Sequence, residues 1–113
     1  MSALTFTMKT RLDQRVDMSP LVCNKLDGMT PTKIAKIELQ NGKRKIRVDE
    51  LFKIKGEDTQ NIIIEGSFAK LDFIGKQLDG GSITIHGDVG AYLGQEMKAG
   101  TIKIEGNTGI YAA

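Results

Sequence analysis

GGSITIHGDVGAYLGQEMKAGTIKIEGNTG, residues 80–109, contains nearly the same hexapeptide twice. SITIHG at 82–87 returns nineteen residues later as TIKIEG at 101–106, and IIIEG at 62–66 precedes both. Each copy has two isoleucines that alternation places on one face of a strand, and each is closed by a glycine. A period near twenty with one short strand per repeat is typical of a solenoid, in which stacked coils share one core.

Glycines between the strands follow the same spacing. Gly75 and Gly81 return as Gly94 and Gly100, while the strand interval shortens from 21 to 19 residues. The two extra residues fit within 67–72. Glycine at such corners lets the backbone take a positive φ or pass close to a neighbouring coil. We therefore expect a glycine-rich β-helix of about two to three coils over residues 61–113.

The first sixty residues have a different composition and form the second expected unit. They hold twelve of the 16 Lys and Arg residues but only three of the thirteen glycines. Alternation over residues 4–10 predicts a strand. Ser19-Pro20 and Thr30-Pro31 each predict a helix start, the first helix ending at Gly28. Asn41-Gly42 predicts a type I′ hairpin turn, and residues 49–52 a short turn before the next strand. We expect an α+β unit over 1–60 that caps the first coil.

Bulk properties narrow the classes of protein. A chain of 113 residues with a net charge of +2 has the length of one domain and weak support for nucleic-acid binding. It contains no run of eighteen apolar residues, so we expect no membrane partner. A single cysteine, Cys23, permits no internal disulfide and fits a reducing compartment. The expected location is the cytoplasm.

Four segments extend these patterns into a resemblance that covers essentially the whole chain. RVDMSPL at 15–21, IAKIEL at 34–39, VDELFKIKGED at 48–58 and LDFIG at 71–75 accompany the glycine-rich coils. Together they resemble the C subunit of formylmethanofuran dehydrogenase and of the related formyltransferase/hydrolase complex of methylotrophs. The coils alone are also similar to the right-handed β-helix at the C-terminus of the large glutamate synthase subunit. Members of the first family run on for several more coils, whereas this chain ends inside its third strand repeat.

The resemblance implies a right-handed β-helix in a structural subunit of a complex of one-carbon metabolism, in methanogenesis or methylotrophy. It implies that the chemistry belongs to partner subunits, one a metal-dependent hydrolase-like chain and one, in the dehydrogenase, a molybdenum or tungsten pterin chain. No cofactor or metal is then expected on this chain, and no catalytic residue of its own. Dehydrogenase and formyltransferase/hydrolase complexes remain alternatives. A stand-alone β-helix module that binds a small molecule or anion is the other candidate function.

The residues offer few alternatives to a non-catalytic role. One His and one Cys fall short of the several converging ligands that a metal site needs. Cys23 with His86 as nucleophile and base would require a third, orienting group. The segment 87–94 lacks the spacing of a phosphate-binding loop, and Glu57-Asp58 lies in a turn. The basic hairpin could touch an anion, although such charges are more often solvated. It comprises Lys43, Arg44, Lys45 and Arg47.

Two surface features are expected from the repeat. Glu65, His86 and Glu105 each precede a coil's closing glycine and point away from the isoleucines, so they should form a ladder on neighbouring strands about 4.8 Å apart. The last coil exposes an uncovered strand edge, which predicts an interface with a second copy or another chain. The expected anchors of that interface are Ile102, Ile104, Ile110 and Tyr111.

Overall fold

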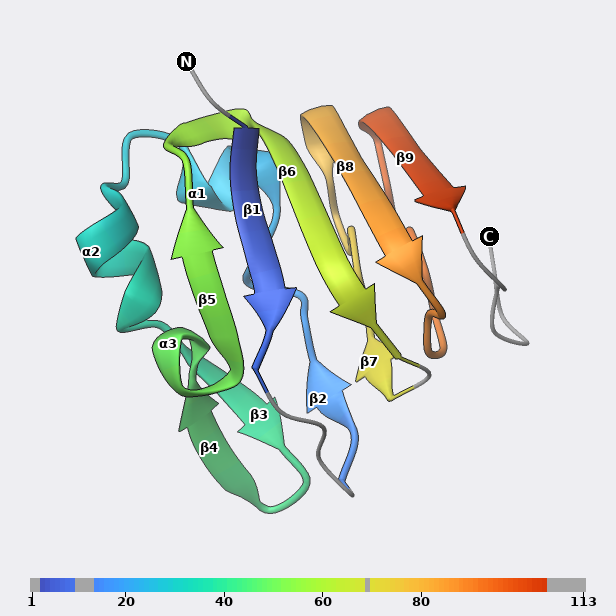
Figure 1. Cartoon of the computed structure of the whole chain (residues 1–113). Helices are drawn as coiled ribbons and strands as arrows, with labels where there is room; N and C mark the ends of the chain where they lie inside the picture. The colour runs from blue at the N-terminus through green and yellow to red at the C-terminus, as the bar shows by residue number, and fades with distance from the viewer. Residues whose placement is uncertain (1–2, 10–13, 69, 106–113) are drawn as a thin grey trace.

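The computed structural model describes residues 3–9, 14–68 and 70–105, and these fold into two mixed sheets around one core (Figure 1). The larger sheet has the strand order β5-β1-β6-β8-β9 and the smaller one β4-β3-β2-β7. The prediction of a mainly β fold is therefore confirmed. The strands are β1 (Ala3–Met8), β2 (Val16–Asp17), β3 (Glu38–Asn41), β4 (Arg44–Arg47), β5 (Phe52–Lys55), β6 (Asp58–Ser67), β7 (Leu71–Asp72), β8 (Asp79–Gly87) and β9 (Ala99–Glu105), and the helices are α1 (Cys23–Leu26), α2 (Pro31–Ala35) and α3 (Val48–Leu51).

The three isoleucine strands pair as the sequence alignment predicts. β6, β8 and β9 run parallel, with Ile62 opposite Ile83 and Ile83 opposite Ile102. Ile64, Ile85 and Ile104 form a second row on the same face. The isoleucines of β6 and β8 in these two rows are buried, whereas Ile102 and Ile104 at the end of the sheet are only partly buried. Alternation at period two thus fixes one face of the sheet in the core.

The amino-terminal strand covers the free side of β6. β1 pairs in parallel with β6, placing Leu4 beside Ile62 and Phe6 beside Ile64, and pairs antiparallel with β5 on its other side. Phe6 also meets Phe52 of β5 edge to face, with ring centroids 5.7 Å apart. Both sheets consequently contain strands from each side of residue 60. β1 matches the strand expected from alternation in the first ten residues.

The segments that connect successive strands of the larger sheet lie behind it. They form a second layer, in which these segments pair with one another through backbone hydrogen bonds. β2 lies parallel to β7, with Asp17 opposite Asp72. On the far side of β7, the Gly90 N–H donates to the Leu71 carbonyl, and the Phe73 N–H donates to the Ala91 carbonyl, each at 3.0 Å. Backbone pairing therefore joins one return segment to the next, nineteen residues further along the chain.

One of the two predicted helix starts is confirmed and the other is wrong. Thr30 caps α2 by accepting a hydrogen bond from the Lys33 N–H at 3.3 Å, and Pro31 takes the first helical position. Ser19-Pro20 does not start a helix, because the Asp17 carboxylate accepts from the Ser19 N–H and the chain turns there. The helix begins only at Cys23, and no side chain caps it.

The hairpin is confirmed, but its turn is shifted by one residue. Asn41 pairs with Arg44, so the two-residue loop is Gly42-Lys43. Within that loop only Gly42 has a positive φ, +60°. A positive φ at the first loop position alone is the pattern of a type II′ turn, and the type I′ prediction is therefore wrong. The predicted short turn before β5 is present as α3.

Candidate interaction surfaces

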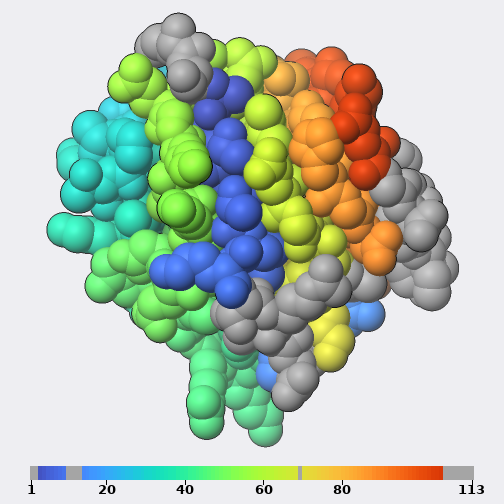
Figure 2. All heavy atoms as spheres, in the orientation of Figure 1, coloured from blue at the N-terminus to red at the C-terminus, as the bar shows by residue number. Residues whose placement is uncertain are grey.

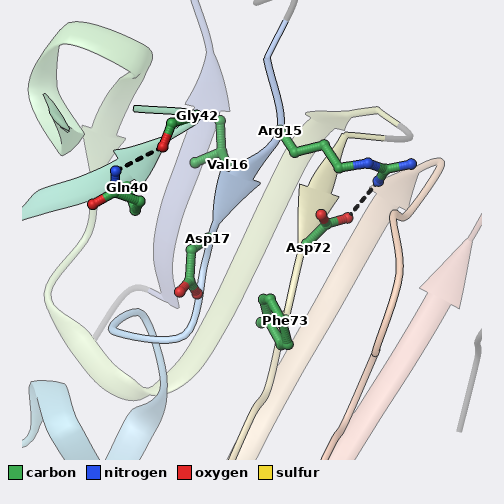
Figure 3. A pocket seen from close by; sticks show the side chains of 7 residues that line it. All are labelled: Arg15, Val16, Asp17, Gln40, Gly42, Asp72 and Phe73. Carbon is green, nitrogen blue, oxygen red and sulfur yellow. Dashed lines mark hydrogen bonds and ion pairs between the residues drawn. The ribbon is translucent and has the colours of Figure 1, made fainter. Parts of the chain in front are cut away.

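A shallow pocket of about 260 Å³ lies where the second layer meets the hairpin (Figure 3). Its floor holds an ion pair between Arg15 Nη1 and Asp72 Oδ1 at 2.7 Å, in which the arginine is 60% exposed and the aspartate 11%. The same Asp72 oxygen accepts from the Ala91 N–H at 2.8 Å. The Asp72 carboxylate therefore links the two neighbouring segments that contain Arg15 and Ala91. The pocket is lined by Arg15, Val16, Asp17, Gln40, Gly42, Asp72 and Phe73.

The predicted ladder residues occupy one row on the outward face of the larger sheet. Glu65 lies opposite His86, and His86 lies opposite Glu105. His86 Nδ1 is 2.8 Å from Glu105 Oε2, with both side chains 44% exposed. Glu65 instead accepts a hydrogen bond from the Thr7 hydroxyl at 3.4 Å. The imidazole is therefore paired with the carboxylate on β9, and the carboxylate on β6 is bonded toward β1.

The structure keeps Cys23 and His86 on opposite faces of the sheet. Cys23 is fully buried beneath β8, and its thiol donates to the Ser82 carbonyl at 3.6 Å. Burial raises the pKa of the Cys23 thiol above its ordinary value. A buried thiol with a raised pKa is a poor nucleophile. The arrangement does not bring a nucleophile and a base together here.

The glycine segment 87–94 is used for backbone pairing with a segment about twenty residues earlier in the chain. The Asp88 N–H donates to Ser67, the Gly90 N–H to Leu71 and the Gly94 N–H to Ile74, at 2.8–3.1 Å. A phosphate-binding loop needs N–H groups that point at the ligand. In this segment the three N–H groups point at backbone carbonyls of the chain instead.

The basic hairpin projects from the end of the smaller sheet, at the bottom of the view in Figure 2. Lys43, Arg44 and Lys45 are exposed, whereas Arg47 is held 2.7 Å from the Asp49 carboxylate. The Asp58 carboxylate accepts from the Asn61 side chain and from the Gln60 N–H, and these bonds, the first being the stronger, lower its pKa.

The predicted interface residues fall in two groups. Ile102 and Ile104 lie on β9 at the end of the larger sheet and pack against the core. Ile110 and Tyr111 lie outside the described residues. In the described ranges, no three His, Cys, Asp or Glu side chains gather in a way that could hold a metal ion. Nor does any described helix have the length and apolar character required to cross a bilayer.

The sequence did not lead us to predict a second kind of corner, at which a residue other than glycine has a positive φ. Phe73 and Tyr92 have φ of 60° and 61°, and Gln77 and Glu96 have φ of 60° and 58°. Each pair is nineteen residues apart, and the glycines at 75, 81, 94 and 100 also have positive φ. Lys76 Nζ lies 5.0 Å from the centre of the Phe73 ring. The sequence did contain a sign of these corners, because an aromatic residue recurs after nineteen residues, the same interval that separates the last two repeated strands.

Comparisons with known proteins agree with the resemblance found in the sequence. The chain is 32% identical over 89 residues to the C subunit of the formyltransferase/hydrolase complex Fhc of Methylorubrum extorquens, covering 79% of this chain and 34% of that protein. It is 31% identical over 95 residues to the C subunit of the tungsten-containing formylmethanofuran dehydrogenase 2 of Methanococcus maripaludis, covering 82% and 35%. No family model matches.

A solved structure shows the same likeness in three dimensions. The chain superposes with a TM-score of 0.86 and 33% identity on a chain of the formyltransferase/hydrolase complex FhcABCD from Methylorubrum extorquens, determined with methylofuran. The match covers 93% of this chain and 40% of that one. The chain thus spans about a third of the length of the curated relatives it matches.

Proposed function

We propose that this chain, which resembles the C subunit of formylmethanofuran dehydrogenase and of the formyltransferase/hydrolase complex, is a non-catalytic structural subunit of such a complex. In this role it docks to the subunits that carry the chemistry of a formyl group in one-carbon metabolism. The observation that carries the proposal is the superposition on a chain of the FhcABCD complex over 93% of the residues. Metal and pterin cofactors would then belong to the partners.

The use made of the polar side chains supports a structural role. The Cys23 thiol is buried against β8, and His86 Nδ1 lies 2.8 Å from a carboxylate oxygen of Glu105. The Asp58 and Asp72 carboxylates accept backbone and side-chain hydrogen bonds that fix turns and join segments. These four side chains are thus employed in holding the fold, and within the part of the chain that the structure describes they do not converge on one site.

We further propose that β6, β8 and β9 are successive rungs of a right-handed β-helix, capped on the side of β6 by residues 1–60. The parallel register of the three strands and the paired return segments support this architecture. A stack of this kind is a rigid spacer, because each rung hydrogen-bonds to the next along its length. We expect the complex to work in the cytoplasm, because a lone buried thiol fits a reducing compartment.

The proposal is tested by isolating the tagged chain from its native cells without denaturation. We expect a metal-dependent hydrolase-like subunit, and in a dehydrogenase also a pterin subunit, to copurify in a fixed ratio. Formyl-carrier activity should follow the tag, while the chain purified alone should have none. A chain that elutes free of any formyl-transfer or pterin subunit, under conditions where the complex itself stays intact, would overturn the proposal.

The alternative function is an anion-binding module, and the exposed tip of the basic hairpin is the observation that favours it. Inorganic phosphate, followed by NMR shifts, is a suitable probe. Binding that is lost when Lys43, Arg44 and Lys45 are replaced by Ser would support this alternative. Replacing Lys53 and Lys55 on β5 by Ser is the matched control, because it removes exposed cations from a different edge.

As part of the proposal, a second chain, either a second copy of this one or another protein, contacts the β9 end of the larger sheet, with the partly buried Ile102 and Ile104 as anchors.

A further inference from the structure

The Asn41-Gly42 pair at the turn of the basic hairpin contains both groups that react in asparagine deamidation. In that reaction the backbone nitrogen of the next residue attacks the carbon of the asparagine side-chain amide. Glycine hinders the attack least, because it has no side chain. The chain has four asparagines, and only Asn41 is followed by glycine. Gly42 is exposed at the pocket drawn in Figure 3, so water reaches this position.

The structure holds both reacting groups against the same short stretch of chain. The Gly42 N–H donates to the Arg15 carbonyl at 3.1 Å. Asn41 Nδ2 donates to the Gln14 carbonyl at 3.2 Å and to the Arg15 carbonyl at 3.4 Å. Asn41 also pairs with Val16 in the ladder between β2 and β3. The Arg15 carbonyl therefore accepts from the attacking nitrogen and from the group that leaves.

These hydrogen bonds oppose the reaction. The Gly42 nitrogen has to lose its proton before it attacks, and that proton is shared with the Arg15 carbonyl. The Asn41 amide has to turn toward its own backbone, and its nitrogen is bonded to residues 14 and 15 instead. We propose that Asn41 is a deamidation site controlled by this contact between the hairpin and residues 14–16. The reaction is slow while the contact is closed and fast when it opens.

The reaction requires water and no other reagent. The Gly42 nitrogen gives up its proton and bonds to Asn41 Cγ, the bond between Cγ and Nδ2 breaks, and the leaving nitrogen takes up a proton and departs as ammonia. The product is a cyclic succinimide. Water then opens the ring at one of its two carbonyls and leaves either aspartate or isoaspartate. The net change is one amide and one water converted to one carboxylic acid and one ammonia.

Both products weaken the contact that controls the reaction. A carboxylate has no N–H to donate, so the bonds to the carbonyls of residues 14 and 15 are lost. Isoaspartate also adds a methylene to the main chain, at the position where Asn41 pairs with Arg44. The new negative charge lies beside the three exposed cations of the hairpin. Deamidation therefore releases the hairpin from residues 14–16 and lowers the positive charge of its tip.

Mass spectrometry of the tryptic peptide that contains Asn41 tests the site and its protection. The purified full chain is incubated in mildly alkaline buffer, with and without urea. Conversion should be at least about tenfold faster in urea, where the contact is open. Asn24 and Asn61, each followed by a bulkier residue, are internal controls and should stay unmodified. Asn41→Gln should abolish the signal. No conversion at Asn41 in urea would overturn the site, and equal rates in both buffers would overturn the protection.

Two valine variants separate local opening of the contact from unfolding of the whole chain. Val16 on β2 and Val22 beside α1 are both fully buried. Val16→Ala should loosen residues 14–16 and speed native deamidation about fivefold or more. Val22→Ala is the matched control and should react at the rate of the unmodified protein. Equal acceleration in both variants would show that global unfolding sets the rate, and would overturn control by the contact.

Hydrogen exchange of the Gly42 amide tests the consequence without either valine variant. Asn41→Asp carries the same side chain as one product, and its Gly42 N–H should exchange about tenfold faster than that of the unmodified protein. An equally protected N–H would contradict release of the hairpin. Far-UV circular dichroism confirms that each variant is folded. None of these outcomes affects the copurification test of the proposed function.

Discussion

Phe73 and Tyr92 stack face to face, with ring centroids 5.2 Å apart and ring planes inclined by 10°. Both residues have a left-handed backbone, which costs a non-glycine residue roughly 1–2 kcal/mol. A stacked aromatic pair contributes about 0.5–1.5 kcal/mol beyond the area it buries. Two such residues cost about 2–4 kcal/mol together, so the stack offsets part of the backbone strain at two consecutive corners.

Substitutions at Tyr92 separate the stacking from the backbone strain. Tyr92→Ala loses the stack but keeps the strain, and should lower the free energy of unfolding by about 1–2 kcal/mol. Tyr92→Gly loses the stack and relieves the strain, so its stability should fall between that of Tyr92→Ala and the unmodified protein. Tyr92→Phe is the control that keeps the ring. Urea unfolding measures all three, and a glycine variant less stable than the alanine variant would contradict the strain.

The strand alignment could be predicted because it follows from local sequence. Isoleucines at every second position and a recurring closing glycine determine both the inward face and the partner of each strand. The start of α2 was likewise predictable, since Thr30 and Pro31 act on the next few residues alone. Such signals do not depend on the rest of the fold.

The wrong or missing predictions have two kinds of cause. Some depend on contacts between residues far apart in the sequence, and others on a local interaction that competes with the predicted one. Ser19-Pro20 carries the same helix-start signal as Thr30-Pro31, but the neighbouring Asp17 carboxylate captures the Ser19 N–H and forms a turn. The Phe73 and Tyr92 corners were missed because positive φ in a bulky residue is rare. The Arg15–Asp72 contact joins residues 57 positions apart, which no local pattern encodes.

Gly87 and Gly80 test how closely β8 approaches β6. Both lie on β8 with positive φ, 125° and 115°. A Cβ at Gly87 would collide with the Ser67 backbone carbonyl, whereas a Cβ at Gly80 would meet nothing within 4 Å. Gly80→Ala should therefore cost only the backbone strain, about 1–2 kcal/mol. Gly87→Ala should cost clearly more, because β6 and β8 must move apart at Ser67. Equal losses in thermal or urea unfolding would contradict the close approach.

Asp72 should matter more to stability than the arginine paired with it. Its carboxylate accepts from the Ala91 N–H as well as from Arg15, and the side chain is almost fully buried. Asp72→Ala leaves that N–H without its acceptor and should cost about 1–3 kcal/mol. Arg15→Ala removes a largely exposed cation and should cost less than about 1 kcal/mol. Urea unfolding of both variants checks the order, and a larger loss for Arg15→Ala would show that the ion pair dominates.

The Cys23 thiol should be unreactive in the folded protein. It is fully buried and donates to the Ser82 carbonyl, and burial raises its pKa. Both the low exposure and the small thiolate fraction slow its reaction with a thiol reagent such as 5,5′-dithiobis(2-nitrobenzoic acid). We expect one equivalent to react in denaturant and almost none in native buffer at neutral pH. Rapid reaction of the folded chain would show that the contact with β8 opens.

The same raised pKa makes stability depend on pH at the alkaline end. As pH rises past about 8.5, the ordinary pKa of a free thiol, the unfolded chain loses the Cys23 proton while the folded chain keeps it. The unfolded state then binds fewer protons, so the free energy of unfolding falls with pH. The stabilisation is complete below the unfolded pKa and is lost as pH rises through the folded one. Tyrosine and lysine titrate nearby, so the measurement is the difference between the unmodified protein and Cys23→Ala in urea unfolding from pH 7 to about 10. That difference should shrink as pH rises, because the alanine variant lacks the thiol contribution. A pH-independent difference would mean that the thiol ionises equally well in both states.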